Sequence, residues 1–428
     1  MTLRRRVFLI VSGTLVFIAL GPLIILMAHG YRYDFKNGHL LVTGTLVIKT
    51  EPRGAQVSLN GQSIGDTPVA RRFLTPNEYL VEITKSEYHS WRKRINIFER
   101  QVTFLPDQNT KINLLLGTPQ NLKSIPRVAD IFSFQDLIFY VDVQGRQIFS
   151  TSFNATSPQL TSSTTSILTN PRFEDGRRIG TGAEFIISSD QGQFYLSADH
   201  KTALPRLAGI QFGNTENTVL GLNDKNQLLE ITPEGSKVLL EDVRAFKRNG
   251  NQIYYLQKIP SGEFGLSRIT SMDDPVLVSK TPAFENASII LSLDNQPYLL
   301  LDRELYAVKD RLEKINSQVE FAYWDSHGNF LLYGNSHESW VYEPLAYNQN
   351  QLLVRATTQT TVPLFHKAAG YTFVIEDKEI KAIETDSSGQ PNIYSLLTSA
   401  DPKKISLNDE GNILGLLDGN DLRLIKIR

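Results

Sequence analysis

The residues best suited to metal or acid–base chemistry are a few histidines and carboxylates. His327 and His337 are ten residues apart, with Asp325 and Glu338 beside them. A zinc site needs convergent ligands on rigid elements, and this spacing matches none of the usual zinc patterns. His327 also falls within a turn-forming segment. We therefore interpret it as a solvated loop histidine.

Acidic turns are the second candidates. Asp175-Gly176 and Asp273-Asp274 could supply calcium ligands, but they lack the alternating oxygen spacing of an EF-hand, and turn capping is the simpler interpretation. No Walker loop, Rossmann fingerprint, HExxH or GxSxG occurs. The chain has no cysteine, which excludes disulfides, thiolate metal sites and cysteine nucleophiles. We expect no catalytic residue, no metal ligand and no cofactor.

Aromatic side chains form the remaining cluster that could bind a ligand. Tyr323, Trp324, Tyr333, Trp340 and Tyr342 fall within twenty residues of sequence. Exposed aromatic residues of this kind stack on sugars or anchor protein partners. Buried ones fill a β core, which is the interpretation that we favour. Tyr323, Trp324, Trp340 and Tyr342 are the candidate partner-binding or glycan-binding residues.

Composition places the chain among folded proteins. It has 428 residues, 41% hydrophobic and 21% charged, which suits two or three domains. The formal net charge of −1 provides no field that would attract nucleic acid. We expect no nucleic-acid partner.

The N-terminal segment predicts a membrane anchor. Three arginines at positions 4–6 precede an uncharged stretch from Val7 to Met27, long enough to cross a bilayer as a helix. The charge bias places the N-terminus in the cytoplasm and the rest outside the plasma membrane. We therefore expect a cytoplasmic tip at 1–6, a single transmembrane helix in the lipid bilayer at 7–28 and a juxtamembrane segment at 29–42.

A cleaved signal peptide is the alternative for this segment. Ala28-His29-Gly30 offers a small-x-small cleavage site, but signal cores have about 7–15 apolar residues and this one is longer. Under both interpretations, the part of the chain after this segment is exported from the cytoplasm. A large exported protein without cysteine suits a prokaryotic envelope.

A small β module is predicted at 43–116. Asn60-Gly61 is a strong signal for a two-residue hairpin turn. From Trp91 to Ile97, residues alternate between two faces, with Trp91, Lys93, Ile95 and Ile97 on one of them.

The order of motifs in this module resembles the PEGA domain. The resemblance rests on a strand, then Pro52-Arg53-Gly54-Ala55, then a strand ending in Asn60-Gly61, then Gly65-Asp66-Thr67-Pro68. This chain has Arg53 where the name motif has Glu, and Asn60-Gly61 where the family usually has Asp-Gly. The resemblance implies a small β-sandwich-like fold, an envelope protein of bacteria or archaea, possible binding of surface components, and no catalytic residues.

The region 117–428 predicts a β-propeller. Short β-type runs recur in pairs joined by Asx/Gly turns, as in Leu137–Val141 followed by Gln147–Ser150. About 310 residues at roughly 40–50 per blade give six to eight blades. The final run, Asp421–Arg428, alternates charged and aliphatic residues, and we expect it to close the ring beside an early strand. Two stacked β domains would give a similar pattern. Residues 307–316 are a possible short helix or connector.

The sequence therefore predicts an all-β envelope protein with an N-terminal transmembrane helix. The expected function is a non-catalytic scaffold that presents the module and the propeller to a protein or a polysaccharide. An envelope glycan-processing enzyme with its site at the propeller centre is the alternative. An assembly or secretion accessory protein is a third hypothesis.

Overall fold

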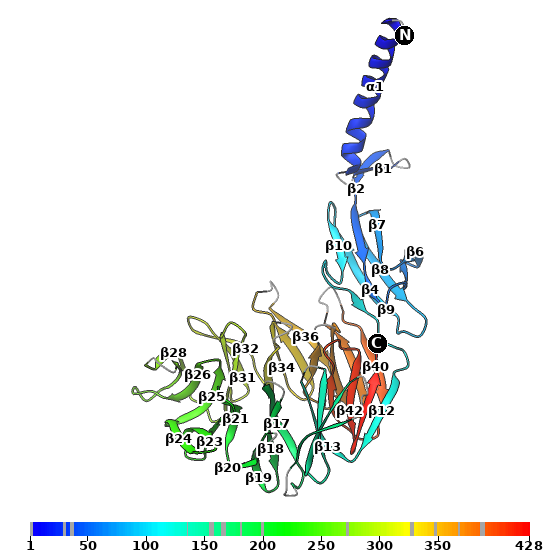
Figure 1. The fold of residues 1–428 in the computed structure, drawn as a ribbon. Coiled ribbons are helices and arrows are strands. Elements are labelled where there is room, and N and C mark those ends of the chain that lie inside the picture. Colours follow the sequence, from blue (N-terminus) through cyan, green and yellow to red (C-terminus); the bar gives the residue numbers. More distant parts are fainter. Residues whose placement is uncertain are drawn as a thin grey trace. The chain divides into compact units, whose positions relative to one another are not determined.

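The computed structural model gives one N-terminal helix followed by strands (Figure 1). The described residues are 3–28, 31–34, 38–134, 136–153, 158–163, 168–179, 182–197, 201–270, 274–325, 329–345, 349–366, 369–385 and 390–428. They divide into two compact units, Met1–Thr118 with Asp386–Asn392, and Pro119–Thr385 with Ile393–Arg428.

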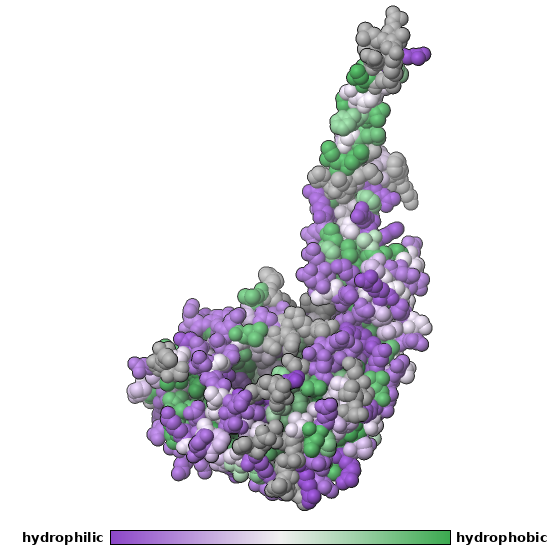
Figure 2. Space-filling view, in the orientation of Figure 1, coloured by the Kyte–Doolittle hydropathy of each residue, from purple (hydrophilic) through white to green (hydrophobic). Residues whose placement is uncertain are grey.

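The helix α1 (Leu3–Ala28) has 26 residues and contains Pro22. Its described surface is mostly hydrophobic in Figure 2, whereas the strands that follow are mostly covered by hydrophilic residues. Over the residues that the structure describes, no helix meets the length and hydropathy of a membrane span. A short antiparallel hairpin follows, in which β1 (Tyr31–Asp34) pairs with β2 (His39–Val42).

The next 70 residues form a small two-layer β module. Three sheets have the strand orders β6-β5-β8-β9, β10-β3-β7 and β11-β4. The strands are β3 (Gly44–Ile48), β4 (Thr50–Glu51), β5 (Gln56–Leu59), β6 (Gln62–Asp66), β7 (Val69–Leu74), β8 (Asn77–Thr84), β9 (Trp91–Ile97), β10 (Val102–Leu105) and β11 (Ile112–Asn113).

Strand alternation builds the core of this module. Burial in β9 follows a strict two-residue period, and its inward side chains are those predicted from the sequence. Trp91 and Ile95 join Leu46 and Val57 in one buried cluster. Asn60 and Gly61 both have positive φ, 47° and 82°, and they connect β5 to β6 as the hairpin signal predicted.

Within the described part of residues 119–428, eight four-stranded antiparallel sheets form a β-propeller. We number them as blades 1 to 8. The first strands of neighbouring blades lie side by side, since β13 contacts both β17 and β41 and β25 contacts both β21 and β29. The expectation of six to eight blades agrees with the eight sheets.

The blades have the following strands. Blade 1 has β13 (Val128–Phe134), β14 (Leu137–Asp142), β15 (Gln147–Ser152) and β16 (Gln159–Ser163); blade 2 has β17 (Arg172–Ile179), β18 (Gly182–Ser189), β19 (Gly192–Leu196) and β20 (Lys201–Leu204); blade 3 has β21 (Ala208–Phe212), β22 (Val219–Leu222), β23 (Leu228–Thr232) and β24 (Gly235–Leu240); blade 4 has β25 (Val243–Asn249), β26 (Gln252–Lys258), β27 (Phe264–Thr270) and β28 (Val276–Thr281).

The second half of the propeller repeats this order. Blade 5 has β29 (Ala287–Leu291), β30 (Pro297–Leu301), β31 (Glu304–Val308) and β32 (Leu312–Asn316); blade 6 has β33 (Phe321–Asp325), β34 (Phe330–Gly334), β35 (Glu338–Tyr342) and β36 (Asn350–Arg355); blade 7 has β37 (Leu364–His366), β38 (Tyr371–Glu376), β39 (Glu379–Glu384) and β40 (Ile393–Thr398); blade 8 has β41 (Pro402–Leu407), β42 (Ile413–Asp418), β43 (Asp421–Lys426) and β12 (Gln120–Pro126).

Blade 8 joins the two ends of the propeller sequence. Its outer strand β12 comes from the start of the region, and its other three strands come from the C-terminus. Asn121 pairs with Ile425, and Ile125 pairs with Leu422. In Figure 1 the red C-terminal strands lie beside the cyan β12. The predicted pairing of the last strand with an early strand is therefore present.

Asx turns connect neighbouring strands within blades 3 and 8. The Oδ1 of Asn223 accepts hydrogen bonds from the backbone of Lys225 and Gln227, and the Oδ1 of Asn408 does the same for Asn412 and Ile413. The recurring Asx/Gly signal in the sequence thus has its expected local cause.

One local prediction was wrong. Residues 307–316 form the end of β31 and all of β32, not a helix. Ala307 pairs with Glu313 across this hairpin, and Ala307 also joins a buried inter-blade cluster. Tertiary burial therefore outweighs the helical propensity of this charged segment.

Candidate functional site

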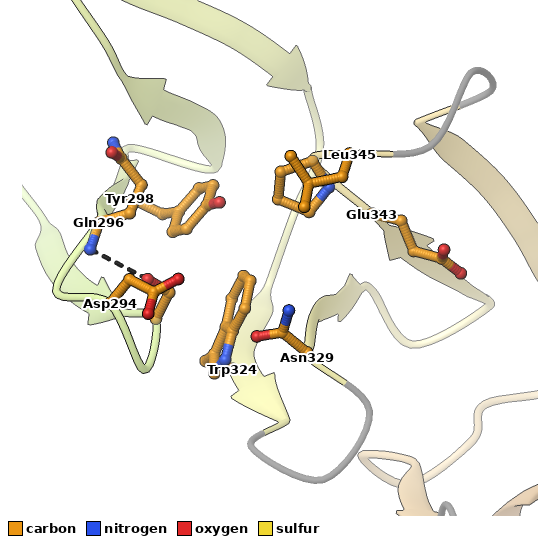
Figure 3. A pocket seen from close by; sticks show the side chains of 9 residues that line it. Asp294, Gln296, Tyr298, Trp324, Asn329, Glu343 and Leu345 are labelled. Atoms are coloured by element: carbon orange, nitrogen blue, oxygen red, sulfur yellow. Dashed lines mark hydrogen bonds between the residues drawn. The ribbon is translucent and has the colours of Figure 1, made fainter.

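The candidate site is a pocket at the seam between blades 5 and 6 (Figure 3). It has a volume of about 430 Å³. The lining side chains come from the β29–β30 turn, from β30 and β33, and from the segments next to β34 and β35: Ser292, Asp294, Gln296, Tyr298, Trp324, Asn329, Glu343, Pro344 and Leu345.

Two stacked aromatic rings form one wall of the pocket. The ring centroids of Tyr298 and Trp324 are 5.5 Å apart, and the ring planes meet at 20°. Tyr342 packs edge-on against Tyr298 from behind, with centroids 6.1 Å apart. Tyr298 and Tyr342 are buried in the cluster that joins blades 5 and 6. The rings are thus held by inter-blade packing before any ligand binds.

Trp324 brings an unused hydrogen-bond donor to this wall. Its indole Nε1 is buried and has no hydrogen-bond partner among the described residues. A buried donor without a partner is unfavourable, and such groups in folded proteins call for an explanation.

The rim of the pocket is acidic and partly apolar. Asp294, Asn329 and Glu343 are exposed there, and the described lining residues include no lysine or arginine. Leu345 is 95% exposed, and Figure 3 shows it facing Tyr298 and Trp324 across the opening.

Backbone geometry fixes the turn that carries Asp294. Asn295 has φ of 60°, its amide donates to the Ser292 carbonyl at 3.1 Å, and Gln296 donates to Ser292 Oγ at 2.9 Å. The side-chain amide of Asn249 in blade 4 donates to Asn295 Oδ1 at 2.8 Å. The turn is therefore held by the neighbouring blade.

Burial keeps the phenol of the wall neutral. Removal from water raises the pKa of Tyr298 far above its ordinary value, and the nearby Tyr342 raises it further. Tyr298 therefore contributes its ring and no charge. The charged groups among the described residues of the rim are the carboxylates of Asp294 and Glu343.

The structure places the four predicted binding residues in different environments. Trp324 lines the pocket and Tyr342 lies directly behind it. Trp340 stacks on Tyr333 at 6.5 Å, and its Nε1 donates to Glu338 at 3.2 Å. Tyr323 points to the other face of β33, where its hydroxyl donates to the Pro363 carbonyl. Their role in binding stays a prediction.

The described histidine and aspartate residues that the sequence analysis considered as metal ligands do not form a metal site. His327 and Asp273 lie outside the described residues. Asp175 lies in β17, not in an open loop, and burial raises the pKa of its carboxyl. Among the residues that the structure describes, no three His, Cys, Asp or Glu side chains are close enough to hold a metal ion.

Several pocket residues could not be selected from the sequence. Tyr298 lies 26 residues before Trp324, and only the packing of blade 5 on blade 6 brings them together. Three other pocket residues directly follow the aromatic cluster in the sequence, and this position was a weak indication that they line the same site: Glu343, Pro344 and Leu345. Asp294 looked like any turn aspartate.

The fold defines a β-propeller protein that carries a small β module before the propeller. Residues 43–117 match the PEGA domain family, which confirms the resemblance drawn from the turn motifs. The match covers one segment of the chain.

Solved structures support the propeller assignment. The chain is similar to the C-terminal WD40 domain of Sif2, with 9% identity, a TM-score of 0.53, and coverage of 73% of this chain and 99% of that one. It is also similar to the Dos1 propeller, with 9% identity, a TM-score of 0.50, and coverage of 72% and 95%. At this identity the likeness concerns the fold alone. No curated protein matches the chain.

Proposed function

We propose that the protein is a non-catalytic, membrane-anchored scaffold of the cell envelope whose propeller binds a partner protein at the pocket between blades 5 and 6. The observation that carries this proposal is the wall of stacked Tyr298 and Trp324 rings in a pocket whose rim bears Asp294 and Glu343. A preformed pocket with a few polar groups is the usual form of a binding site.

The pocket chemistry favours a basic segment of protein. The carboxylates of Asp294 and Glu343 would attract a lysine or arginine head, and the Tyr298–Trp324 wall would pack on its aliphatic stem. Leu345 would cover the bound chain from the opposite side.

The rim carboxylates do not form a catalytic pair in this proposal. Asp294 and Glu343 are exposed and lie on opposite sides of the pocket in Figure 3. A glycosidase acid has a raised pKa, which requires a less solvated setting. We therefore propose that these carboxylates attract a cation and transfer no proton.

The anchor is proposed from the sequence. The uncharged stretch from Val7 to Met27 follows three arginines, so residues 7–28 would cross the plasma membrane with the N-terminus in the cytoplasm. Many described apolar side chains of α1 are open to the surroundings; Phe17 is 77% exposed. A bilayer would remove this apolar surface from water.

Site-specific photo-crosslinking of the full-length protein in cells tests the pocket. A benzophenone side chain at Leu345 is expected to capture a protein partner. The same group at Ile393, an exposed residue of blade 7, is the matched control and is expected to capture none. Trp324→Ala, and separately the pair Asp294→Asn and Glu343→Gln, should reduce the capture at position 345.

Capture at position 345 that is unchanged by Trp324→Ala would disprove the pocket as the site. A glycan array probed with the purified full-length protein separates the glycan alternative. Glycan binding that is lost in Trp324→Ala would replace the protein partner with a polysaccharide. Extraction of the protein from membranes by alkaline carbonate would contradict the anchor.

A further inference from the structure

A second surface lies on the β module, at the end from which the chain leads back to α1. We call it the helix-proximal patch and define it by three exposed apolar side chains and three exposed arginines: Phe73, Phe98, Val102, Arg71, Arg72 and Arg100. Phe73 is 39% exposed and Phe98 is 55% exposed. Two exposed phenylalanines on a module of about 75 residues are unusual for a water-facing surface.

Backbone contacts bring the segments of the patch together. Gly44 at the start of β3 pairs with Leu74, the last residue of β7. A Cβ at Gly44 would lie 2.4 Å from the carbonyl oxygen of Phe98, so the loop after β9 presses directly on β3. The amide of Arg100 donates to the Thr43 carbonyl at 3.0 Å. The two phenylalanines therefore flank the same strand end.

The patch is adjacent to the hairpin that follows α1. The Arg100 guanidinium donates to the Tyr31 hydroxyl and lies 5.3 Å from the centre of the Tyr31 ring. Tyr31 follows Ala28, the last residue of α1, by three residues, which span at most about 10 Å. Whatever surrounds the C-terminal end of α1 is therefore close to the patch.

The exposure of Phe73 depends on a distorted strand. Between the pairs Gly44–Leu74 and Leu46–Arg71, β7 has one more residue than β3, which is a β-bulge. Phe73 within it has φ of 60°, a left-handed conformation that is unfavourable for a bulky side chain. Bulges redirect side chains, and unfavourable backbone conformations are concentrated at functional positions.

The charge of the patch fits an anionic surface. Arg71 and Arg72 have no acidic partner among the described residues. Glu99 is the exposed acid next to Phe98, and Glu78 nearby is paired with Arg94. Arginines outnumber unpaired acids, and arginine with phenylalanine is a combination that binds at the interface of a membrane.

We infer that the helix-proximal patch rests on the surface of an anionic lipid bilayer, with Phe73 and Phe98 in the headgroup layer and Arg71 and Arg72 against lipid phosphates. This inference rests on the proposed anchor. It adds a second membrane contact, which would hold the module in one orientation on the bilayer instead of letting it swing from a single helix.

Labels on the full-length protein in nanodiscs test the inference. The chain has no cysteine, so each introduced cysteine takes one spin label. Gln101→Cys reports from the patch, Ile18→Cys reports from α1, and Ser86→Cys reports from an exposed loop at the far end of the module. Accessibility to oxygen and to a water-soluble nickel complex measures the depth of each label.

In nanodiscs of phosphatidylglycerol and phosphatidylcholine, the label at 101 should become more accessible to oxygen and less accessible to the nickel complex, which is the shift expected for contact with lipid. The label at 86 should remain accessible to the nickel complex. Phe73→Ser with Phe98→Ser should abolish the shift at 101 and leave the label at 18 in lipid. Arg71→Gln with Arg72→Gln should reduce the shift, as should discs of phosphatidylcholine alone.

The outcomes separate the two proposals. An aqueous label at 101 together with a lipid-embedded label at 18 overturns the lipid contact and leaves the anchor intact. An aqueous label at 18 refutes the anchor itself. A shift at 101 that persists in the double serine variant overturns the role given to the phenylalanines.

Discussion

Arg177 and Glu184 form an ion pair of 2.7 Å within blade 2, where only 7% of the Glu184 side chain is exposed. The same guanidinium donates to the backbone carbonyls of Gly213 at 2.6 Å and Thr215 at 2.8 Å. It also lies 4.6 Å from the ring centre of Phe212 in blade 3. One side chain therefore joins two neighbouring blades and neutralises a buried carboxylate.

Arg177→Met is predicted to destabilise the propeller strongly. It leaves Glu184 buried without its cation, and breaking a buried pair in this way costs about 3–5 kcal/mol. The measurement is the free energy of unfolding by urea. Arg355→Met is the matched control, because its pair with Glu338 is exposed and should be worth less than about 1 kcal/mol. Equal losses in the two variants would contradict this reasoning.

The closing blade gives a second prediction. Leu424 of β43 is fully buried in the cluster shared by blades 1 and 8, and it pairs with Lys123 of β12. Leu424→Ala should lower the free energy of unfolding by about 2–5 kcal/mol, because it leaves a cavity at this junction. Lys426→Ala, at an exposed position of the same strand, should change it by less than about 0.5 kcal/mol. A small effect of Leu424→Ala would mean that the ring does not depend on this strand.

The repeated local signals explain why the fold class could be predicted. The turn of a β-hairpin is determined by residues that are neighbours in the sequence. The turns at Asn60-Gly61 and at Asn408 could therefore be predicted directly. Alternation in β9 identified even Lys93 as an inward-facing residue. The closing strand was predictable because a strand at the end of a ring of blades can pair with a strand from its start, as β43 does with β12 while it also pairs with β42.

The pocket was only partly predictable because it depends on contacts between blades. Trp324 and Trp340 are similar in sequence context, yet one lines a pocket and the other hydrogen-bonds to Glu338. Their difference comes from their positions on β33 and β35 and from Tyr298 in the preceding blade. The residues around each tryptophan in the sequence do not indicate which of the two rings lies at the boundary between blades 5 and 6. The interpretation of residues 307–316 as a possible short helix or connector was wrong for a related reason, since the burial of Ala307 depends on tertiary contacts.

The two tryptophans therefore provide a third prediction. Trp324→Phe removes a buried donor that has no partner, whereas Trp340→Phe removes a donor that is bonded to Glu338. Both changes remove similar ring area. Trp340→Phe should cost about 1 kcal/mol more in unfolding free energy, the usual worth of one hydrogen bond. A larger cost for Trp324→Phe would show that its indole nitrogen already has a partner in the ligand-free protein.

The pH dependence of stability gives the last prediction. Lys381 hydrogen-bonds to Glu376 in blade 7, and this bond lowers the pKa of the Glu376 carboxyl. An acid whose pKa is lower in the folded state stabilises the protein above its unfolded pKa of about 4.3, and that contribution disappears as the pH falls through the folded pKa. Glu376→Gln should therefore cost about 1 kcal/mol at pH 7, and the variant and the original protein should converge only as the pH falls below the lowered pKa of folded Glu376. Glu216→Gln, at an exposed carboxylate without an ion pair among the described residues, is the matched control and should change the unfolding free energy at pH 7 by less than about 0.5 kcal/mol. Urea unfolding at a series of pH values measures both profiles, and a constant difference for Glu376→Gln down to acid pH would rule out the ionic contribution.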